Sequence, residues 1–418
     1  MSLQTELRHV IHALADALDL VGVDDVAHGK RVGIMAAACA GELGADAVES
    51  AFLFDLGMLH DIGVSSTRTH QHLVTEFDWE GAQGHAETGY ALLKDYPPLA
   101  DMALPVRYHH THWSELVASS VDPLVARRAN LIYLVDRVDA LAAPYYASNA
   151  VLKHMAAIRD EIAARVGSCF APEWVAAFLA ASACEAFWLR LEPRSVQAIL
   201  QDRLVGLEAS AAPPVALRDL ARVFSRIVDA KSPFTAAHSL GVAGVAVLLA
   251  ARMGVAPHNV AQLEIAGLLH DLGKLRVPDE ILDKPGKLDP DERLVINSHS
   301  FETFQILRNI PGFGDIARWA AYHHEEPGGR GYPFHVDGAA LPLEARILRV
   351  ADIFQAMVQS RPYRTGLRAD EALDFLHRLA AEGRIDTDIV AVLADHLDEA
   401  MTAARAAEGA QPEDSVHA

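Results

Sequence analysis

Cysteine is scarce in this chain of 418 residues. The three cysteines, Cys39, Cys169 and Cys184, form no CxxC pair, which excludes a disulfide framework and suits the reducing cytoplasm. Long apolar runs are also missing, since none approaches about 18 uninterrupted residues, and the charged N-terminus has no apolar segment typical of a signal peptide. We therefore expect a cytoplasmic protein without a membrane span or a secretory leader.

Basic residues are few relative to acidic ones. The chain has 36 Lys and Arg against 56 Asp and Glu, which gives a net charge of −20. Proteins that follow DNA or RNA, or that lie on anionic membranes, carry a basic surface, so neither a nucleic-acid polymer nor a membrane is an expected partner. With 51% hydrophobic and 22% charged residues, the composition is that of a globular protein.

Strand signals are rare as well. Alternating β-branched segments with Asn-Gly turns are scarce, whereas apolar residues recur every three or four positions, which predicts an all-α fold. A break rich in proline and small residues lies between residues 192 and 214, so we expect one domain over residues 1–200 and a second over 215–402. Residues 403–418 lose the periodicity and are expected to form a flexible tail.

Histidine is abundant, with 21 copies, and its positions repeat. Seven His and Asp positions recur in the same order in both halves, at offsets of 210 to 216 residues. In the first half they are His28, His60, Asp61, His85, His109, His110 and Asp136. In the second half they are His238, His270, Asp271, His299, His323, His324 and Asp352. This predicts two copies of one helical domain.

The repeated residue types are those that bind metals. Imidazole and carboxylate are ligands for divalent transition metals, and a carboxylate can bridge two ions. Two metals about 3.5–4 Å apart are a known solution for hydrolysing phosphate esters. A single His on an apolar helix is more often a core or surface residue than a ligand, but an ordered set present twice favours a metal site. Gly63 and Gly273, two residues after the His-Asp pairs, are interpreted as helix stop signals.

The order His, His-Asp, His, His-His, Asp resembles the HD superfamily of metal-dependent phosphohydrolases, in both halves. The second half, over about residues 220–400, resembles the HD-GYP family, phosphodiesterases that hydrolyse cyclic di-GMP and in some members the mixed cyclic GMP-AMP dinucleotide. The motifs that carry this second resemblance are His270-Asp271-Leu272-Gly273-Lys274, His323-His324-Glu325, Gly331-Tyr332-Pro333 and Arg361-Pro362-Tyr363-Arg364. Over residues 10–150 only the broader HD pattern is supported.

The resemblance implies tandem HD-type domains and a phosphodiesterase with two divalent ions, Fe or Mn, in the second domain. The implied metal ligands are the seven repeated positions of that half, with Asp271 as the bridging and catalytic carboxylate. Lys274 is the other catalytic residue implied, as a cation on a phosphate oxygen. The substrate-binding residues implied are Lys274, Gly331, Tyr332, Pro333, Arg361 and Arg364. The expected product is a linear dinucleotide. A second cleavage of this product to GMP is left open. We interpret Gly331 as a bare position that lets the backbone approach a ligand.

Three positions in the second half depart from the family pattern. Phe234 stands where some members have an extra ligand for a third metal, so two metals are expected. Gly328 and Gln355 each stand where the family usually has Asp, which puts substrate preference in doubt more than activity.

The first half keeps its seven candidate ligands but lacks the groups that hold a dinucleotide. Val64 takes the place of Lys274, no GYP loop follows the His-His pair, and Tyr145-Tyr146 replaces the arginine motif. Whether this half binds metal is left open. We expect a regulatory role for it, through packing on the second half or on the partner in a homodimer.

Three functions are compatible with the sequence. The first is hydrolysis of cyclic di-GMP or a related cyclic dinucleotide such as cyclic GMP-AMP. The second is a catalytically inactive sensor or scaffold that binds the nucleotide without turnover. The third is hydrolysis of other nucleotides, as in the wider HD superfamily, which the GYP loop disfavours. The complete ligand set together with Lys274 favours the first.

Overall fold

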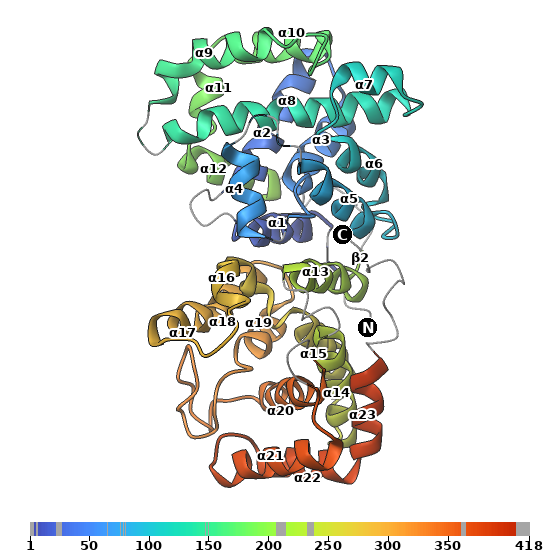
Figure 1. The fold of residues 1–418 in the computed structure, drawn as a ribbon, viewed down its shortest axis with the longest axis vertical. Helices are drawn as coiled ribbons and strands as arrows, with labels where there is room; N and C mark the ends of the chain where they lie inside the picture. Colours follow the sequence, from blue (N-terminus) through green and yellow to red (C-terminus); the bar gives the residue numbers. More distant parts are fainter. Residues whose placement is uncertain are drawn as a thin grey trace. The chain divides into compact units, whose positions relative to one another are not determined.

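Helices form nearly all the regular structure of the computed structural model, which confirms the all-α prediction (Figure 1). The structure describes residues 4–5, 7–21, 27–64, 66–75, 77, 79, 81–146, 148, 150–205, 215–231, 238–360 and 365–406. Two-residue strands β1 (Gln4–Thr5) and β2 (Val215–Ala216) pair with each other. No helix among the described residues is long and apolar enough to cross a membrane.

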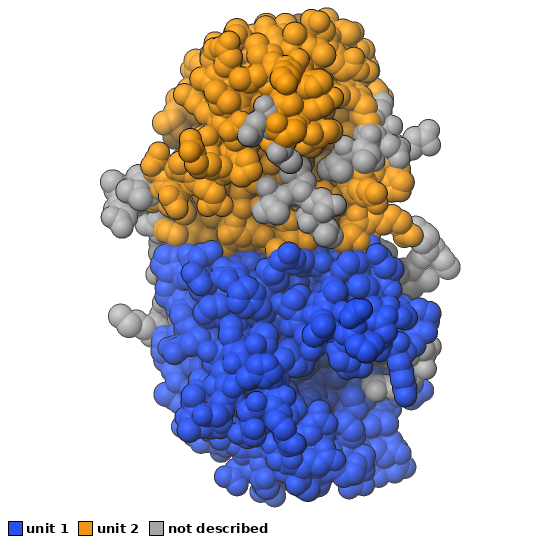
Figure 2. All heavy atoms as spheres, turned by 90° about the vertical axis from the view of Figure 1, so that its left-hand side faces the viewer, with its two compact units in different colours: residues 1–5, 216–418 blue, residues 6–215 orange. Residues whose placement is uncertain are grey.

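The chain divides into two compact units, coloured separately in Figure 2. The N-terminal unit comprises residues 6–215, and the C-terminal unit comprises residues 1–5 and 216–418. The helices of the N-terminal unit are α1 (Leu7–Leu18), α2 (His28–Glu42), α3 (Ala47–Leu59), α4 (Thr67–Thr75), α5 (Ala82–Leu93), α6 (Ala100–Tyr108), α7 (Trp113–Ala118), α8 (Pro123–Tyr146), α9 (Val151–Ala163), α10 (Pro172–Ala181), α11 (Glu185–Leu189) and α12 (Pro193–Val205).

The C-terminal unit contains eleven α-helices and one 3₁₀ helix, η2, among its described residues. They are α13 (Leu217–Lys231), α14 (His238–Arg252), α15 (Pro257–Leu269), η2 (Leu272–Arg276), α16 (Asp279–Leu282), α17 (Pro290–Asn297), α18 (His299–Leu307), α19 (Gly314–Ala321), α20 (Leu343–Val358), α21 (Ala369–Ala381), α22 (Thr387–Asp395) and α23 (Leu397–Ala406). Helix α23 includes residues 403–406, so this part of the predicted flexible tail is helical. Residues 407–418 lie outside the described residues.

The sequence repeat corresponds to a repeat of helices. Helices α2, α3, α5, α6 and α8 carry the repeated residues of the first half, as α14, α15, α18, α19 and α20 do in the second. Helix α2 packs against α3 and α8, and α14 packs in the same way against α15 and α20. Small residues allow the close contact between α2 and α3, and between α14 and α15. A Cβ on Gly57 of α3 would lie 2.6 Å from the Gly33 Cα of α2. The matching contact is Gly267 against Ala243, where the distance would be 2.9 Å.

The helices begin where local chemistry favours it. Asp46 caps α3 by accepting hydrogen bonds from the Val48 and Glu49 amides, at 3.0 and 2.8 Å. Helix α15 begins with Pro257, whose fixed φ suits the first helical position.

The interpretation of Gly63 and Gly273 as helix stop signals is corrected by their packing. Neither has a positive φ, and a Cβ on either would lie 2.0 Å from a backbone oxygen, that of His85 or His299 respectively. These glycines therefore allow the His-Asp turn to approach the helix that carries the next histidine.

Candidate functional site

The repeated histidines of the C-terminal unit lie at helix ends that meet in its interior. His238 is the first residue of α14, His270 follows the last residue of α15, and His299 begins α18. The His-His pair follows α19, and Asp352 lies within α20. Four histidines of this set are each 4% exposed or less: His238, His270, His299 and His323. Histidine is not a typical core residue, so apolar packing does not explain why the fold buries them together.

The seven side chains form two groups joined by one carboxylate. One group consists of His238, His270 and Asp352. The other consists of His299, His323 and His324. Asp271 lies between them, with Oδ2 3.3 Å from His270 Nε2 and Oδ1 3.5 Å from His299 Nε2. The structure therefore brings together all seven predicted ligands of this half and puts Asp271 where a bridging carboxylate would be needed.

The polar atoms at the centre of the cluster fit a bound cation. His270 Nε2 and Asp271 Oδ1 are buried and have no hydrogen-bond partner among the described residues, which is costly unless a ligand occupies the site. The Nδ1–H of His270 and of His323 donates to a backbone carbonyl, Gly267 O at 2.7 Å and Ala320 O at 2.6 Å. This bond fixes the tautomer and leaves Nε2 free as a metal ligand.

The protonation states of three of the histidines also suit metal binding. Burial lowers the pKa of His299 to about 4 and lowers the pKa values of His323 and His324 well below 6.5. These imidazoles are therefore neutral at pH 7, as ligation requires. Burial alone would raise the pKa of Asp271, but the neighbouring His270 and Lys274 outweigh it and lower that pKa well below 3.8. The carboxylate is therefore ionised.

Lys274 lies at the edge of this cluster. Its Nζ donates to Asp271 Oδ2 at 2.5 Å, so the structure places the predicted phosphate-binding cation directly beside the predicted bridging carboxylate. The side chain is only partly buried, and its ammonium can bind an incoming anion.

The Gly331-Tyr332-Pro333 loop packs against the His-His pair. The Tyr332 ring stacks on His324 at 4.7 Å between ring centres. A Cβ on Gly331 would lie 2.4 Å from Glu325 Cα, so the missing side chain lets the loop approach the protein's own backbone. This corrects the expectation that Gly331 lets backbone approach a ligand. Pro333 is half-buried next to Tyr332.

Three positions singled out in the sequence have no described structure. Arg361 and Arg364, the two predicted substrate-binding arginines, and Phe234, the position of the absent extra ligand, lie outside the described residues.

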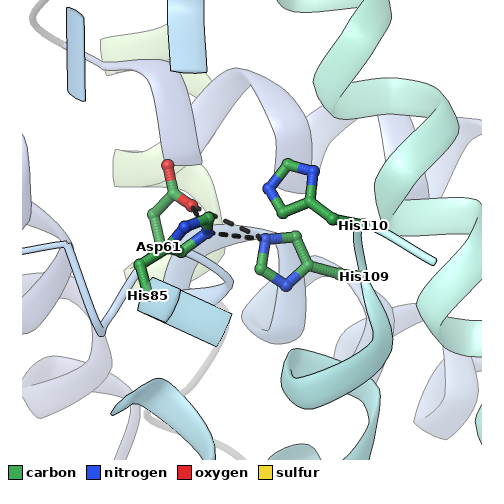
Figure 3. A group of neighbouring side chains, drawn as sticks. All are labelled: Asp61, His85, His109 and His110. Carbon is green, nitrogen blue, oxygen red and sulfur yellow. Dashed lines mark hydrogen bonds and ion pairs between the residues drawn. The ribbon is translucent and has the colours of Figure 1, made fainter. Parts of the chain in front are cut away.

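The N-terminal unit contains a similar cluster (Figure 3). One group consists of Asp61, His85, His109 and His110, and the other of His28, His60 and Asp61. Asp61 is again shared, with Oδ1 3.2 Å from His85 Nε2 and Oδ2 3.8 Å from His28 Nε2. Asp136 completes the predicted set, with Oδ1 3.3 Å from His28 Nε2. His60 Nε2 and Asp61 Oδ1 are buried without hydrogen-bond partners in the described part of the chain, as are the matching atoms of the other unit.

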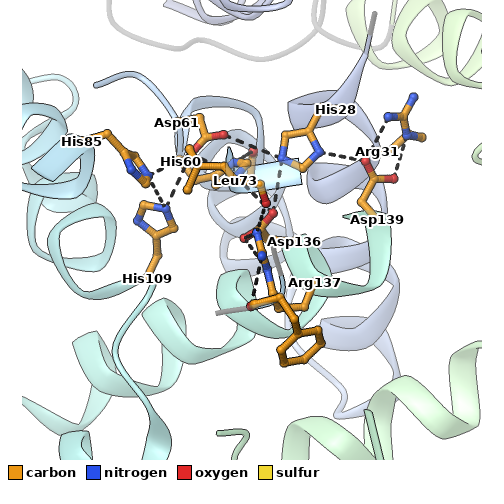
Figure 4. Close-up of polar contacts among 12 residues, drawn as sticks. His28, Arg31, His60, Asp61, Leu73, His85, His109, Asp136, Arg137 and Asp139 are labelled. Atoms are coloured by element: carbon orange, nitrogen blue, oxygen red, sulfur yellow. Dashed lines mark hydrogen bonds and ion pairs between the residues drawn. The ribbon is translucent and has the colours of Figure 1, made fainter. Parts of the chain in front are cut away.

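The two clusters differ in what holds their first histidine, and Figure 4 shows the contacts of His28 in the N-terminal unit. The Nδ1–H of His28 donates to Asp139 Oδ2 at 2.8 Å, and Asp139 in turn accepts from Arg31 and Tyr146, at 2.7 and 2.9 Å. In the C-terminal unit Gln355 takes the place of Asp139 and Gly241 that of Arg31.

In the C-terminal unit, the corresponding histidine, His238, lacks such a carboxylate at Nδ1 among the described residues. His238 Nδ1 and Gln355 Oε1 are both buried and lack a partner among the described residues. A Cβ on Gly241 would lie 2.3 Å from the Gln355 side chain, so the longer amide fills the space that Arg31 takes up in the other unit. Among the described residues, the first histidine therefore has a carboxylate partner at Nδ1 only in the N-terminal unit.

The N-terminal cluster adjoins a small cavity and has a different cation. The cavity beside it is about 20 Å³, room for one water molecule, and Val64 lines it where the other unit has Lys274. Arg137 is buried and donates to Asp136 Oδ2 at 2.9 Å and to the Leu73 carbonyl at 3.0 Å. Its positive charge is thus committed to the protein and is not presented to a substrate.

The residues that support the ligands are not among the predicted site residues. Glu325 is fully buried and accepts from the Phe334 and Val336 amides, at 2.7 and 3.1 Å, which ties the GYP loop to the His-His pair. Asp139, Arg31 and Arg137 were missed because the other half has different residues at those positions. The signal available was spacing, since each of Asp139 and Arg31 lies three residues after a candidate ligand on the same helix.

Family models match both halves of the chain. A model described as HD domain matches residues 26–141, and a second model of the same description matches residues 222–389. These ranges contain all fourteen repeated His and Asp positions.

A curated relative and a solved structure resemble most of the chain, and further relatives resemble part of it. It is 35% identical over 398 residues to 3'3'-cGAMP-specific phosphodiesterase 1 of Vibrio cholerae serotype O1, covering 93% of this chain and 91% of the relative. It is 45% identical over 157 residues to phosphodiesterase 3 of the same series and organism, covering 38% of this chain and 34% of the relative. The crystal structure of V. cholerae V-cGAP3, a cyclic GMP-AMP-specific phosphodiesterase, matches with a TM-score of 0.61 and 24% identity, over 99% of this chain and 100% of that one.

A further relative is the cyclic di-GMP phosphodiesterase response regulator RpfG of Xanthomonas campestris pv. campestris. The identity is 38% over 163 residues, covering 38% of this chain and 43% of the relative. The structural match indicates the fold, and the long alignment to the first relative indicates the family. The chain therefore belongs to the HD-domain family and, within it, to the HD-GYP-type phosphodiesterases.

Proposed function

We propose that the C-terminal unit hydrolyses cyclic di-GMP or a related cyclic dinucleotide such as 3'3'-cGAMP to a linear dinucleotide, with further cleavage, to GMP in the case of cyclic di-GMP, as a second step. The observation that carries this is the pair of ligand groups joined by Asp271, with buried, unpartnered atoms at its centre and Lys274 at its edge. Relatives in the family are named as phosphodiesterases for both cyclic dinucleotides, which supports this substrate class.

The ligand arrangement supports two divalent ions, Fe or Mn, in the C-terminal unit. One would be held by His238, His270 and Asp352, the other by His299, His323 and His324, with Asp271 shared. Bound metals supply Lewis acidity and a water activated at neutral pH. Both Fe and Mn accept imidazole and carboxylate ligands, so the donor set fits either.

The chain's own residues bind and orient the substrate. Lys274, which bonds Asp271 in the described structure, is placed to bind a non-bridging phosphate oxygen once cations balance the charge of Asp271. Tyr332, stacked on His324, offers its hydroxyl and ring edge to a base or phosphate. Arg361 and Arg364 stay predicted contacts for phosphate or guanine.

The N-terminal unit is proposed to bind metal without hydrolysing a dinucleotide. Its ligand cluster is complete, and His28 has a carboxylate partner of the kind that orients metal-binding histidines. Its cavity of about 20 Å³ is too small for a nucleotide, and Val64 offers no charge for a phosphate. A regulatory role, the homodimer and the cytoplasmic location stay predictions.

The experiment that tests the activity uses the full chain, loaded with Fe or Mn in the absence of oxygen. We expect chelator-sensitive formation of a linear dinucleotide from cyclic di-GMP or 3'3'-cGAMP. Binding of either nucleotide without product would instead favour the inactive sensor.

The metal content of the same preparation reports the number of loaded clusters. About two ions per chain imply that one cluster is loaded, and about four imply both. About three would contradict the argument from Phe234.

A further inference from the structure

A second cavity, of about 380 Å³, lies in the N-terminal unit between α2, α3, α11 and α12. None of the repeated His and Asp positions lines it, so it is separate from the metal-ligand cluster of that unit. Its volume lies within the range of small-molecule sites, about 300–1,000 Å³.

The cavity has one apolar side formed by three helices. Small residues, Ala37 and Ala38, face it from α2 and leave it hollow, and both stay half-exposed. Ile34 on the same helix, Phe187 on α11 and Ile199 on α12 complete this side. A ligand with an apolar or planar portion would gain hydrophobic burial there.

The other side carries two arginines. The Arg203 guanidinium carbon lies over the Phe54 ring, 3.8 Å from its centre, so the cation contacts an aromatic face. Asp55, the acid that acts on Arg203 from a distance, is itself paired with Arg8 at 3.7 Å. Arg190, at the end of α11, is exposed and forms no ion pair with a described residue.

We propose that this cavity binds an organic phosphate monoester that carries a planar ring, a ligand the size of a nucleoside monophosphate. Two guanidinium groups match the charge of a phosphate monoester, about −1.5 to −2 at pH 7, and can bind its oxygens bidentately. The half-buried Arg203 has lost part of its hydration and forms no ion pair with a described residue, so an anion would supply a partner. The ring would lie against Phe187 and the neighbouring apolar residues.

The site is independent of the activity proposed for the C-terminal unit, and the test separates the two. Binding of AMP and GMP to the full chain is measured by titration calorimetry, with guanosine as the probe that lacks the phosphate. The variants Arg190→Gln, the double variant Arg190→Gln/Arg203→Gln, and Ala38→Leu remove the charges or fill the hollow. Arg194→Gln is the matched control, since Arg194 is exposed on α12 and does not line the cavity. Lys274→Met removes the phosphate-binding cation of the other unit.

We expect AMP or GMP to bind the wild type and Lys274→Met alike, and guanosine to bind at least about tenfold more weakly. Arg190→Gln, whose exposed side chain can be changed without disturbing the fold, should weaken binding about tenfold or more, and Ala38→Leu should do the same. Arg194→Gln should bind as the wild type does. The proposal is overturned if neither nucleotide binds at about 1 mM, if Lys274→Met abolishes binding, or if Arg190→Gln and Ala38→Leu both bind as tightly as the wild type.

Discussion

Lys274 is the residue that most clearly separates the two clusters in chemical terms. It donates to Asp271 at 2.5 Å in the C-terminal unit, whereas buried Val64 holds that position in the N-terminal unit. A cation beside the shared carboxylate can stabilise the charge that develops on a phosphate during attack. An apolar side chain at the same place cannot, although the metal ligands around it are the same.

Replacing Lys274 by Met should therefore lower hydrolysis on the order of a hundredfold, with the metal content unchanged, because Lys274 binds no metal. The measurement is the rate of linear product formation together with metal per chain. Arg276→Gln is the matched control, because Arg276 is an exposed cation on the same short helix and pairs with Glu302. Unchanged activity in Lys274→Met would contradict the role given to the residue.

A second prediction at this scale concerns Asp139. Asp139→Asn removes the carboxylate that orients His28, so the N-terminal cluster should lose about 10–100-fold in metal affinity. Metal retained per chain after dialysis against graded chelator measures the effect. Tyr146→Phe is the control, since it removes a different hydrogen bond to Asp139 and leaves the one to His28 in place. Equal retention in Asp139→Asn and the wild type would mean that the N-terminal cluster holds no metal through His28.

The residues that could be predicted are those that the two halves share. Fourteen His and Asp positions, seven in each half, are identified by the sequence repeat. The structure gathers the seven of each half into one cluster. The supporting residues could not be found in this way, because Asp139 has Gln355 as its counterpart and Arg31 has Gly241. Glu325 belongs to a predicted motif. Its hydrogen bonds from the Phe334 and Val336 amides could not be predicted, because they depend on the path of a loop that the sequence does not specify.

Helical elements were predictable from periodicity, whereas their close contacts were not. Gly63 and Gly273 looked like helix stop signals, but they let the His-Asp turn approach α5 and α18. Such a contact joins positions more than twenty residues apart, and its sequence signal is a single glycine, which also ends helices.

Gly273→Ala should accordingly destabilise the C-terminal unit by several kcal/mol, on the order of an overpacked core substitution, because the new Cβ would lie 2.0 Å from the His299 carbonyl oxygen. Urea unfolding measures the loss. Gly84→Ala is the control: Gly84 is exposed in α5 with nothing within 4 Å, so the variant should be neutral or more stable by about 0.5–1 kcal/mol. A neutral Gly273→Ala would contradict the close contact.

At the scale of the whole molecule, the same fold occurs in two compact units with different surroundings for the same ligands. The division into two helical copies could be predicted, because the repeat is a property of the sequence. The cavities could not, since the hollow beside Ala37 and Ala38 depends on where α11 and α12 pack against α2.

The N-terminal unit should respond to acid through His12. Burial lowers the pKa of His12 to about 4, whereas an unfolded His titrates near pH 6.5. Because the unfolded chain takes up the proton first, this unit should lose stability as pH falls from 6.5 towards 4, by about 2 kcal/mol at pH 5. Urea unfolding of wild type and His12→Leu at pH 7.5 and 5 measures it. The variant should show a smaller decrease on acidification, and an equal decrease would contradict the assignment.

The central claim is that only the C-terminal cluster hydrolyses the dinucleotide, and paired ligand variants test it most directly. The double variant His270→Ala/Asp271→Ala and its counterpart His60→Ala/Asp61→Ala remove matching positions from the two clusters. Production of linear dinucleotide is measured for both after anaerobic loading with metal. We predict no detectable product from the first variant and at least about a tenth of wild-type activity from the second. Full activity in His270→Ala/Asp271→Ala, or complete loss in His60→Ala/Asp61→Ala, would contradict the account.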